Sequence, residues 1–251
     1  MELPSDRVRS FTRRPWVRTG LDFVWPRMCW LCEISLQQTT HEAFCSNCRT
    51  DLSGDSLPSC LRCSSTVGPH TETADGCPRC AKETYRFRST TRLGIYAGLL
   101  REAVLKCKQP TGESLAEHLG ELFAEQRRDK LLARAPQIIV PIPLHWQRRW
   151  LRWFNQAEAI GRGLARGLGL PIESRAIRRT EPTPKLADLT GAERRALLKD
   201  SMARGTVRGI RGLRILLVDD VLTTGATADA ASRVLLEAGA AQVDVAVLAH
   251  R

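Results

Sequence analysis

The sequence predicts an α/β fold, with a parallel sheet and flanking helices, preceded by a small cysteine-rich segment. From residue 88 onward, short apolar runs typical of buried strands alternate with longer segments of helical periodicity. Strands and helices that alternate in this way are joined by right-handed crossovers and form a parallel sheet. Before residue 87, eight cysteines stand in a stretch that is rich in Gly, Pro, Ser and Thr and poor in large apolar residues. Such a stretch cannot build its own core, so we expect it to need another source of stability.

The N-terminal segment, residues 1–23, is basic and contains Arg7, Arg9, Arg13, Arg14 and Arg18. It lacks the apolar stretch and small-residue cleavage site of a signal peptide, so we expect a solvated tail. The chain has 251 residues, 43% of them hydrophobic, which is typical of a globular protein with one large or two smaller domains. It contains no run of about 18 apolar residues, so no transmembrane helix is expected.

Eight of the nine cysteines form four Cys-x-x-Cys pairs, which are Cys29/Cys32, Cys45/Cys48, Cys60/Cys63 and Cys77/Cys80. Two such pairs supply the tetrahedral four-sulfur shell of a structural Zn²⁺ ion. Four pairs therefore predict two zinc sites, a double zinc ribbon over residues 24–86. Sequential pairing is the simplest arrangement, and the spacing is also compatible with an interleaved one. A disulfide framework is the alternative, but it is typical of secreted proteins.

The remaining residues, 87–251, are expected to form one domain. The apolar patterns predict strands at residues 88–96, 137–140, 215–218 and 243–248. They predict helices at residues 98–108, 113–128, 156–168 and 228–238. Gly161 and Gly163 lie inside one of these helices without a strand directly before them, which favours close helix packing over a dinucleotide-binding loop. Cys107, the ninth cysteine, is expected to be a small, partly buried residue rather than a nucleophile.

The most informative run is residues 215–227. Four apolar residues are followed by two carboxylates, Asp219 and Asp220, at the expected carboxyl end of a strand. A turn of small and hydroxyl residues then leads into a helix. The first N–H groups of a helix have no internal partner and attract anions, and glycine lets the backbone approach a phosphate closely. Carboxylates repel phosphate but suit sugar hydroxyls or a metal ion. The run therefore predicts a site for a phosphorylated sugar at the carboxyl edge of the sheet.

This run resembles the 5-phosphoribosyl-1-pyrophosphate (PRPP) motif of type I phosphoribosyltransferases; the alternative is an ordinary strand-to-helix turn with a chance Asp pair. The resemblance implies that Asp219 and Asp220 are catalytic residues that meet the ribose hydroxyls, with Mg²⁺ bound alongside PRPP. It implies that the ligand is held by Asp219, Asp220, Val221, Leu222, Thr223, Thr224, Gly225, Ala226 and Thr227.

Positive charge is concentrated in residues 145–214, which hold 16 Lys and Arg against 6 Asp and Glu, a net charge of +10 of the total +11. A section with this charge suits the binding of a polyanion. Pyrophosphate and a nucleic-acid backbone are both candidate ligands, and a basic surface that is only solvated is the alternative. Arg148 and Arg149 are candidates for contacting pyrophosphate or DNA. Arg178 and Arg179 are further candidates, in a segment that we expect to close over the site as a hood, together with Lys185, Arg194 and Arg195.

Three further blocks, residues 96–108, 140–145 and 152–157, are similar to the ComF family of competence-associated proteins. That family has a double zinc ribbon ahead of a phosphoribosyltransferase-like domain. The resemblance implies a cytoplasmic protein, or one peripheral at the inner membrane, that helps imported single-stranded DNA enter the cell with a helicase-like partner. One departure is Trp153, because the family usually has glycine at this position.

Two functions from different classes remain open. The pocket could bind PRPP in a DNA-handling protein, or the chain could be an active phosphoribosyltransferase with a nucleotide or amine acceptor in nucleotide metabolism. Glutamine-dependent transfer is disfavoured, because residues 1–86 are tail and ribbon rather than a glutaminase domain. Trp146, Trp150, Trp153 and Phe154 lie among arginines and could stack on single strands, although core packing is favoured for Trp146 and Phe154. Asn155 is expected to cap the following helix.

Overall fold

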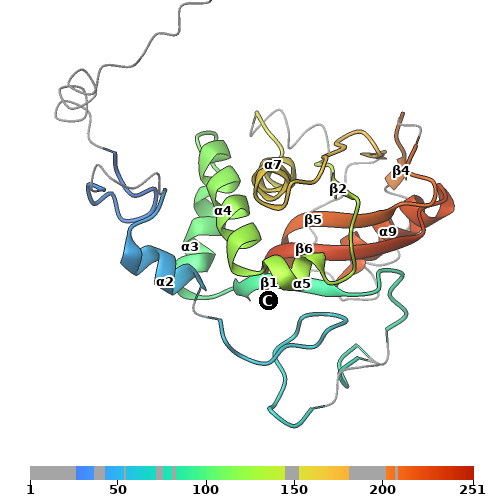
Figure 1. Ribbon diagram of the computed structural model, residues 1–251, viewed down its shortest axis with the longest axis horizontal. Helices are drawn as coiled ribbons and strands as arrows, with labels where there is room; N and C mark the ends of the chain where they lie inside the picture. Colours follow the sequence, from blue (N-terminus) through green and yellow to red (C-terminus); the bar gives the residue numbers. More distant parts are fainter. Residues whose placement is uncertain are drawn as a thin grey trace, which may run out of the picture. The chain divides into compact units, whose positions relative to one another are not determined.

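Four parallel strands form the central sheet (Figure 1). They are β1 (Thr90–Ile95), β2 (Ile138–Pro141), β5 (Arg214–Leu222) and β6 (Gln242–His250), in the spatial order β1-β6-β5-β2. Each neighbouring pair is parallel, with Ile215 opposite Val243 in the central pair. Because all four strands run the same way, their carboxyl ends lie along one edge, as the α/β prediction requires.

The structure is a computed structural model, and it describes residues 27–36, 43–53, 55–71, 76–80, 83–144, 153–180, 202–206 and 209–251. The chain divides into two compact units, residues 1–49 and residues 50–251. The basic tail, residues 145–152 and the segment 181–201 lie outside the described residues. Within the described part of the chain, no helix is long and apolar enough to cross a membrane.

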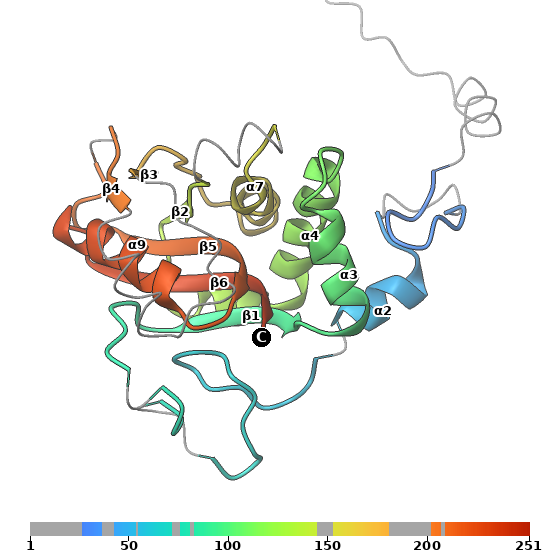
Figure 2. The ribbon, with the colours of Figure 1, turned by 180° about the vertical axis from the view of Figure 1, so that it is seen from behind.

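Helices cover both faces of the sheet (Figures 1 and 2). On one face, α9 (Ala226–Glu237) places Ala231 and Val234 against Val243 and Val245 of β6. Successive residues of a strand point to opposite faces, so the alternate residues of β5 and β6 meet the helices on the other side. Those helices are α3 (Gly98–Lys106), α4 (Glu113–Gln126) and α7 (Gln156–Leu168).

Several elements differ from the sequence prediction. The predicted helix over residues 113–128 ends at Gln126, and a short helix, α5 (Arg128–Leu132), follows it. The pattern did not predict α2 (Ser46–Ser53), nor the antiparallel pair β3 (Ile177–Arg179) and β4 (Met202–Arg204). The hood arginines 178 and 179 therefore lie on a strand. The helix predicted over residues 156–168 is confirmed at both ends.

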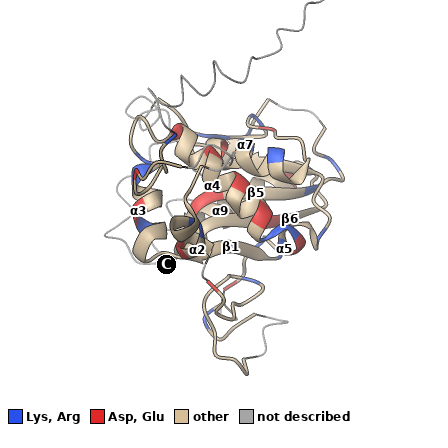
Figure 3. Ribbon diagram, turned by 60° about the vertical axis from the view of Figure 1, so that its left-hand side comes forward, with Lys and Arg blue, Asp and Glu red and all other residues tan. Residues whose placement is uncertain are grey.

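Helices α4 and α7 pack at very short range through glycine, as the sequence suggested. A Cβ atom added at Gly163 would lie 2.0 Å from the carbonyl oxygen of Glu117, and one at Gly120 would lie 2.2 Å from that of Ile160. Arginines of α7 also pair with glutamates of α4; Figure 3 marks the positions of basic residues in blue and of acidic residues in red along the ribbon. Arg166 reaches Glu117 at 2.7 Å and Glu121 at 2.8 Å, and Arg162 pairs with the same helix.

We expect Gly163→Ala to destabilise the fold by about 1–3 kcal/mol or more, because the new methyl group meets backbone that cannot move without separating the helices. Gly161→Ala on the same helix is the matched control. Its Cβ would meet the end of the Ile172 side chain at 2.9 Å, which can rotate away. Chemical denaturation followed by circular dichroism compares the two. Equal denaturation midpoints for the two variants would contradict the close contact between α4 and α7 at Gly163.

Candidate functional site

The acidic pair lies within β5 rather than after it, which corrects the sequence prediction. The strand continues past Val218, and its ladder with β6 extends to Leu222 opposite His250. Aspartate has a low strand propensity, but pairing with a buried neighbouring strand overrides it. Asp219 and Asp220 therefore stand on a rigid element near the carboxyl edge of the sheet.

Residues 223–227, called the phosphate loop below, join β5 to the first turn of α9. Gly225 is the residue before the helix and has φ +75°, a conformation that favours glycine. The helix begins at Ala226, two residues earlier than the sequence predicted. Its first N–H groups therefore face the loop, as at the anion-binding helix termini of other proteins. The arrangement can hold a phosphate group beside the two carboxylates.

Two cations lie near the acidic pair. The ammonium nitrogen of Lys108 is 2.9 Å from a carboxylate oxygen of Asp220. Arg179 on β3 lies close enough for its charge to lower the pKa of Asp219, so one hood residue does reach the site. The sequence assigned no role to Lys108, although this residue ends the block of residues 96–108 that resembles the ComF family. Arg178 on the same strand is exposed.

The pKa of Asp219 is raised to about 7. Burial is the largest cause, and the neighbouring charge of Asp220 adds to it, whereas Arg179 and Lys108 act in the opposite direction. A carboxyl group with a pKa near neutrality changes its protonation state in the range where general acids and bases work. The site therefore contains one carboxyl group that can hold or release a proton near pH 7.

We expect Asp219→Asn to stabilise the protein increasingly as the pH rises from about 4 to about 7. Unfolded aspartate ionises near pH 4, but folded Asp219 keeps its proton up to a pH of about 7. The folded chain thus binds more protons in this window, and wild-type stability falls as pH rises. Asparagine cannot ionise, so the difference vanishes near pH 4 and is constant above pH 7. Thermal melts of the wild type and of Asp219→Asn at three pH values measure this difference in stability. A difference that does not change with pH would contradict the raised pKa of Asp219.

The last cysteine pair and the segment that follows it contact the phosphate loop. The hydroxyl group of Tyr85 donates to the carbonyl oxygen of Thr224 at 3.0 Å, and the guanidinium group of Arg79 donates to that of Thr223 at 3.3 Å. Arg86 pairs with Asp229, in the first turn of α9, at 3.0 Å. These contacts could not be predicted from the sequence, because they join residues more than 130 positions apart.

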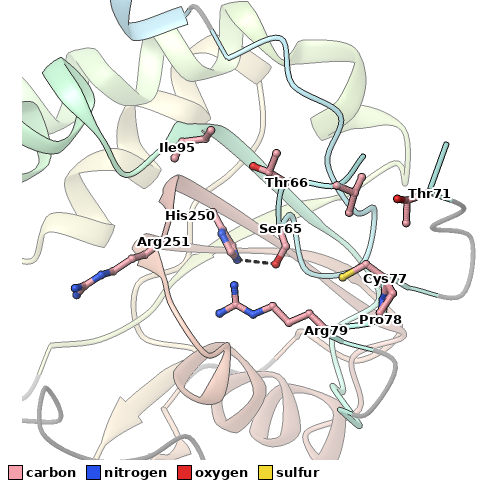
Figure 4. Close-up of a pocket in the computed structure, with 10 residues that line it drawn as sticks. Ser65, Thr66, Thr71, Cys77, Pro78, Arg79, Ile95, His250 and Arg251 are labelled. Carbon is pink, nitrogen blue, oxygen red and sulfur yellow. Dashed lines mark hydrogen bonds between the residues drawn. The ribbon is translucent and has the colours of Figure 1, made fainter. Parts of the chain in front are cut away.

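A cavity of about 430 Å³ lies at the ends of β1 and β6, between them and the second cysteine-rich segment (Figure 4). On its wall, the buried imidazole of His250 lies 3.3 Å from the hydroxyl oxygen of Ser65. Burial, together with the charges of Arg79 and Arg92, lowers the pKa of His250 to about 4, so this side chain is neutral at pH 7. The cavity is lined by Ser65, Thr66, Val67, Thr71, Cys77, Pro78, Arg79, Ile95, His250 and Arg251.

The eight paired cysteines form two tetrads in sequential order. The first tetrad is Cys29, Cys32, Cys45 and Cys48, and the second is Cys60, Cys63, Cys77 and Cys80. In the second, the sulfur atoms of Cys60 and Cys80 are 3.7 Å apart and those of Cys63 and Cys77 are 3.6 Å apart. A tetrahedral zinc ion with bonds of about 2.3 Å needs sulfur–sulfur edges of about 3.8 Å. Both tetrads could therefore hold zinc, and interleaved pairing is excluded.

Backbone N–H groups favour the thiolate form at one cysteine of each tetrad, whereas burial raises the pKa of Cys48 and Cys80. Burial alone would raise the pKa of Cys29, but amides of Cys32, Cys45 and Leu31 lower it to about 6. In the same way, the pKa of Cys77 is lowered to about 7. All nine cysteines are free thiols, so none is used in a disulfide. Cys107 is buried and its pKa is raised to about 12 by that burial, as expected for a packing residue rather than a nucleophile.

We expect metal analysis of the purified chain to give two zinc ions per molecule. Cys29→Ser combined with Cys32→Ser should leave one ion, because two thiolates alone do not complete a tetrahedral shell. Cys107→Ser is the matched control and should leave two. Inductively coupled plasma spectrometry measures the ratio. A wild-type value of zero or one would contradict two structural sites.

The turn before α7 contains one strained residue. Trp153 has φ +65° and is 83% exposed, so a bulky side chain occupies a backbone conformation that suits glycine. The next residue, Phe154, is buried as expected. Asn155 caps α7 by accepting from the Ala157 N–H group at 3.2 Å, and its amide donates to Ile142 at 3.0 Å. The predicted contacts of Arg148 and Arg149, and those of Trp146 and Trp150, lie outside the described residues.

Comparisons with known proteins agree with this architecture. Residues 159–251 match the family model of the phosphoribosyl transferase domain. "DNA utilization protein YhgH" of Escherichia coli (strain K12) is 31% identical over 88% of this chain and 95% of its own length. "Competence protein F" of Haemophilus influenzae is 28% identical over 82% of this chain and 90% of its own. "Competence protein ComFC" of Bacillus subtilis (strain 168) is 38% identical over 41% of this chain and 40% of its own.

The aligned region covers 88% of this chain for the Escherichia coli relative and 82% for the Haemophilus influenzae relative. An N-terminal pair of cysteine tetrads, a parallel sheet with flanking helices and a phosphoribosyl transferase domain match the layout that the sequence suggested. The chain therefore belongs to the ComF family of competence-associated proteins.

Proposed function

We propose that the chain binds PRPP, or a related phosphoribosyl ligand, at the phosphate loop and the acidic pair. One observation carries the proposal. A rigid strand carries two carboxylates near its carboxyl end, and the chain then passes through a glycine of positive φ into a helix N-terminus at the carboxyl edge of a parallel sheet. Phosphate suits the helix N-terminus, and sugar hydroxyls suit the carboxylates.

Each group of the ligand has a matching part of the site. Residues 223–227 offer backbone N–H groups and threonine hydroxyls to the 5′-phosphate. Asp219 and Asp220 accept hydrogen bonds from the ribose hydroxyls. Mg²⁺ bound with PRPP would neutralise the pyrophosphate charge. Lys108 now neutralises Asp220 at 2.9 Å, and a bound pyrophosphate group is an alternative partner for this lysine.

Isothermal titration calorimetry with PRPP and Mg²⁺ tests the proposal. We expect saturable binding of one ligand per chain that ribose 5-phosphate displaces, since the loop recognises the phosphate shared by both compounds. Absence of binding, or binding that ribose 5-phosphate does not displace, would contradict a phosphoribosyl site.

We further propose that this site serves a cytoplasmic protein that handles imported single-stranded DNA. Two relatives carry names that refer to competence, and another is named for DNA utilization. The basic section of residues 145–214 supplies charge for a phosphate backbone, with Arg148 and Arg149 as its candidate contacts. The exposed ring of Trp153 offers a face on which a base can stack. A helicase-like partner and peripheral association with the inner membrane belong to the same proposal.

A second candidate is active phosphoribosyl transfer, and the pKa of Asp219 favours it. In that reaction the C1–oxygen bond to pyrophosphate breaks and a bond from C1 to the acceptor forms. A carboxyl group with a pKa of about 7 is able to take the proton that the acceptor loses. The test is pyrophosphate release from PRPP across a panel of bases and amines. Release with any acceptor establishes an enzyme, and none with every acceptor favours the ligand-binding role.

The domain boundaries also remain a proposal. We expect residues 24–86 to form the ribbon domain and residues 87–251 the phosphoribosyltransferase-like domain, behind the tail of residues 1–23. The contacts of Tyr85 and Arg79 with the phosphate loop support close cooperation between the second tetrad and the larger domain.

A further inference from the structure

We propose that Tyr85 and Arg79 are positioning residues of the phosphate loop, and that a zinc ion in the second tetrad sets how tightly that loop binds a phosphoribosyl ligand. The inference rests on the proposed phosphoribosyl site. It goes beyond that site because it gives the second tetrad a part in ligand binding, whereas a structural zinc site only holds its own segment folded.

The Tyr85 side chain packs between the second tetrad and the phosphate loop. Its half-buried ring packs against the cysteine cluster and stacks on Phe87 with the ring centres 4.6 Å apart. On the other side, a Cβ atom added at Gly225 would lie 2.8 Å from the ring, so the loop fits directly against it. The Tyr85 hydroxyl group donates to the carbonyl oxygen of Thr224 at 3.0 Å. A displacement of this ring therefore displaces the backbone on which the phosphate would rest.

Arg79 is placed even more directly by the metal site, because it lies inside the Cys77–Cys80 pair. Its guanidinium group donates to the carbonyl oxygen of Thr223 at 3.3 Å. With Thr224 held by Tyr85, two consecutive carbonyl groups of the loop are held by side chains of the same segment. Each carbonyl group shares a planar peptide unit with the N–H group of the next residue, so holding it also fixes the direction in which that N–H group points.

The other half of the tetrad is anchored to the sheet. Thr90 of β1 donates through its backbone N–H group to the carbonyl oxygen of Leu61 at 3.0 Å, and through its hydroxyl group to that of Arg62 at 2.8 Å. Arg92, only 4% exposed, binds the carbonyl oxygen of Ser64 and pairs with Asp55 at 2.7 Å. The Cys60–Cys63 pair is thus fixed on β1.

A metal ion would join these two halves. One pair of ligands is anchored on β1, and the other carries Arg79 and leads to Tyr85 at the phosphate loop. The sulfur atoms of the two pairs already lie 3.6 to 3.7 Å apart, which fits a zinc ion between them. Without the ion, only hydrogen bonds join the two pairs, among them the one from the Cys77 N–H group to the Cys60 sulfur at 3.2 Å. These bonds are much weaker than metal–thiolate bonds, so the loop-holding half can then move more easily relative to the sheet. Zinc and the phosphoribosyl ligand therefore stabilise the same arrangement of the tetrad and the phosphate loop. By thermodynamic linkage, the binding of each one raises the affinity of the protein for the other.

The experiment measures PRPP binding with Mg²⁺ by calorimetry in zinc-loaded wild-type protein and in two matched double variants. Cys77→Ser/Cys80→Ser removes the loop-holding half of the second tetrad, and Cys29→Ser/Cys32→Ser removes the equivalent half of the first. We expect the former to weaken PRPP binding by about 5- to 150-fold, the usual range of coupling between two sites. The latter loses a zinc ion as well but should bind PRPP as wild type does.

Two further measurements separate positioning from folding. Tyr85→Phe keeps the ring and removes only the donated hydrogen bond, so it should weaken PRPP binding while the zinc content stays at two. Saturating PRPP should also raise the zinc affinity of the second tetrad by the same factor by which zinc raises PRPP affinity, as competition with a coloured chelator would show. A tetrad that only holds its segment folded would leave the zinc affinity unchanged.

The outcomes are distinguishable. If wild-type protein binds PRPP but neither the second-tetrad variant nor Tyr85→Phe binds more weakly, the inference is wrong and the phosphoribosyl site stands. If wild-type protein does not bind PRPP, the proposed function itself fails. If the second-tetrad variant does not fold, Tyr85→Phe and the zinc affinity still decide, because neither needs a cysteine replaced.

Discussion

Asp219→Ala combined with Thr224→Ala should abolish PRPP binding. The Thr224 hydroxyl group lies in the phosphate loop, and a hydrogen bond to a charged group contributes about 1.5–3 kcal/mol, or about 10- to 150-fold in affinity. Asp219 adds the contact with the ribose hydroxyls, so we expect Asp219→Ala alone to weaken binding at least as much. Calorimetry with Mg²⁺ present measures each single variant and the pair.

Thr50→Ala serves as the control, because Thr50 is an exposed threonine on α2. It should bind PRPP with wild-type affinity. Circular dichroism must show that both loop variants remain folded. Folded variants with unchanged binding isotherms would remove the phosphate loop and the acidic pair from the site altogether.

Single-stranded DNA should bind the chain with an affinity that falls at least tenfold between 50 and 200 mM salt. The basic section of residues 145–214 neutralises phosphates, and the release of their counterions makes binding steeply salt-dependent. Arg148→Ala/Arg149→Ala should weaken binding at low salt and flatten this dependence. Fluorescence anisotropy with a labelled oligonucleotide measures both effects.

The matched control is Lys130→Ala/Arg134→Ala, which removes the same charge from two exposed positions outside the basic section. It should leave DNA binding near that of wild type. An equal loss in both variants would mean that only the net charge matters. An affinity that does not change with salt would contradict electrostatic DNA binding.

The sequence predicted best those features that are local. Helix α7 has a strong apolar period, a capping asparagine at residue 155 and a terminal glycine at residue 169 with φ +72°, so both of its ends were predictable. The turn from β5 into α9 was predictable for the same reason, because a glycine and several hydroxyl residues between an apolar run and a helical pattern are typical of such a turn. Its phosphate-binding role stays a prediction. Sequential tetrads followed from the cysteine spacing as the simplest of two arrangements.

Features that depend on distant residues were not predictable. Nothing near Asp219 indicates that its strand extends to Leu222, because the extension comes from pairing with β6. The ion pair of Lys108 with Asp220 and the contact of Tyr85 with Thr224 each join segments more than 100 residues apart. Residue patterns report periodicity along the chain, and they carry no direct information about which side chains meet across it.

The structure also reduces the number of basic residues that are available to contact DNA. Two of the 16 basic residues in the section 145–214, Arg162 and Arg166, are paired with glutamates of α4. These arginines help to hold two helices together, so they are poor candidates for DNA contacts. The available positive charge is therefore smaller than the sequence count, and it is concentrated in fewer positions.

The most direct test of the phosphoribosyl site is to locate a bound phosphorylated sugar on the molecule. Ribose 5-phosphate is titrated into isotopically labelled protein, and the backbone amide resonances are followed by nuclear magnetic resonance. Our account predicts that the largest shifts occur at residues 223–227 and at the neighbouring Asp219 and Asp220. Shifts confined to other parts of the chain, with those of the phosphate loop unchanged, would contradict it.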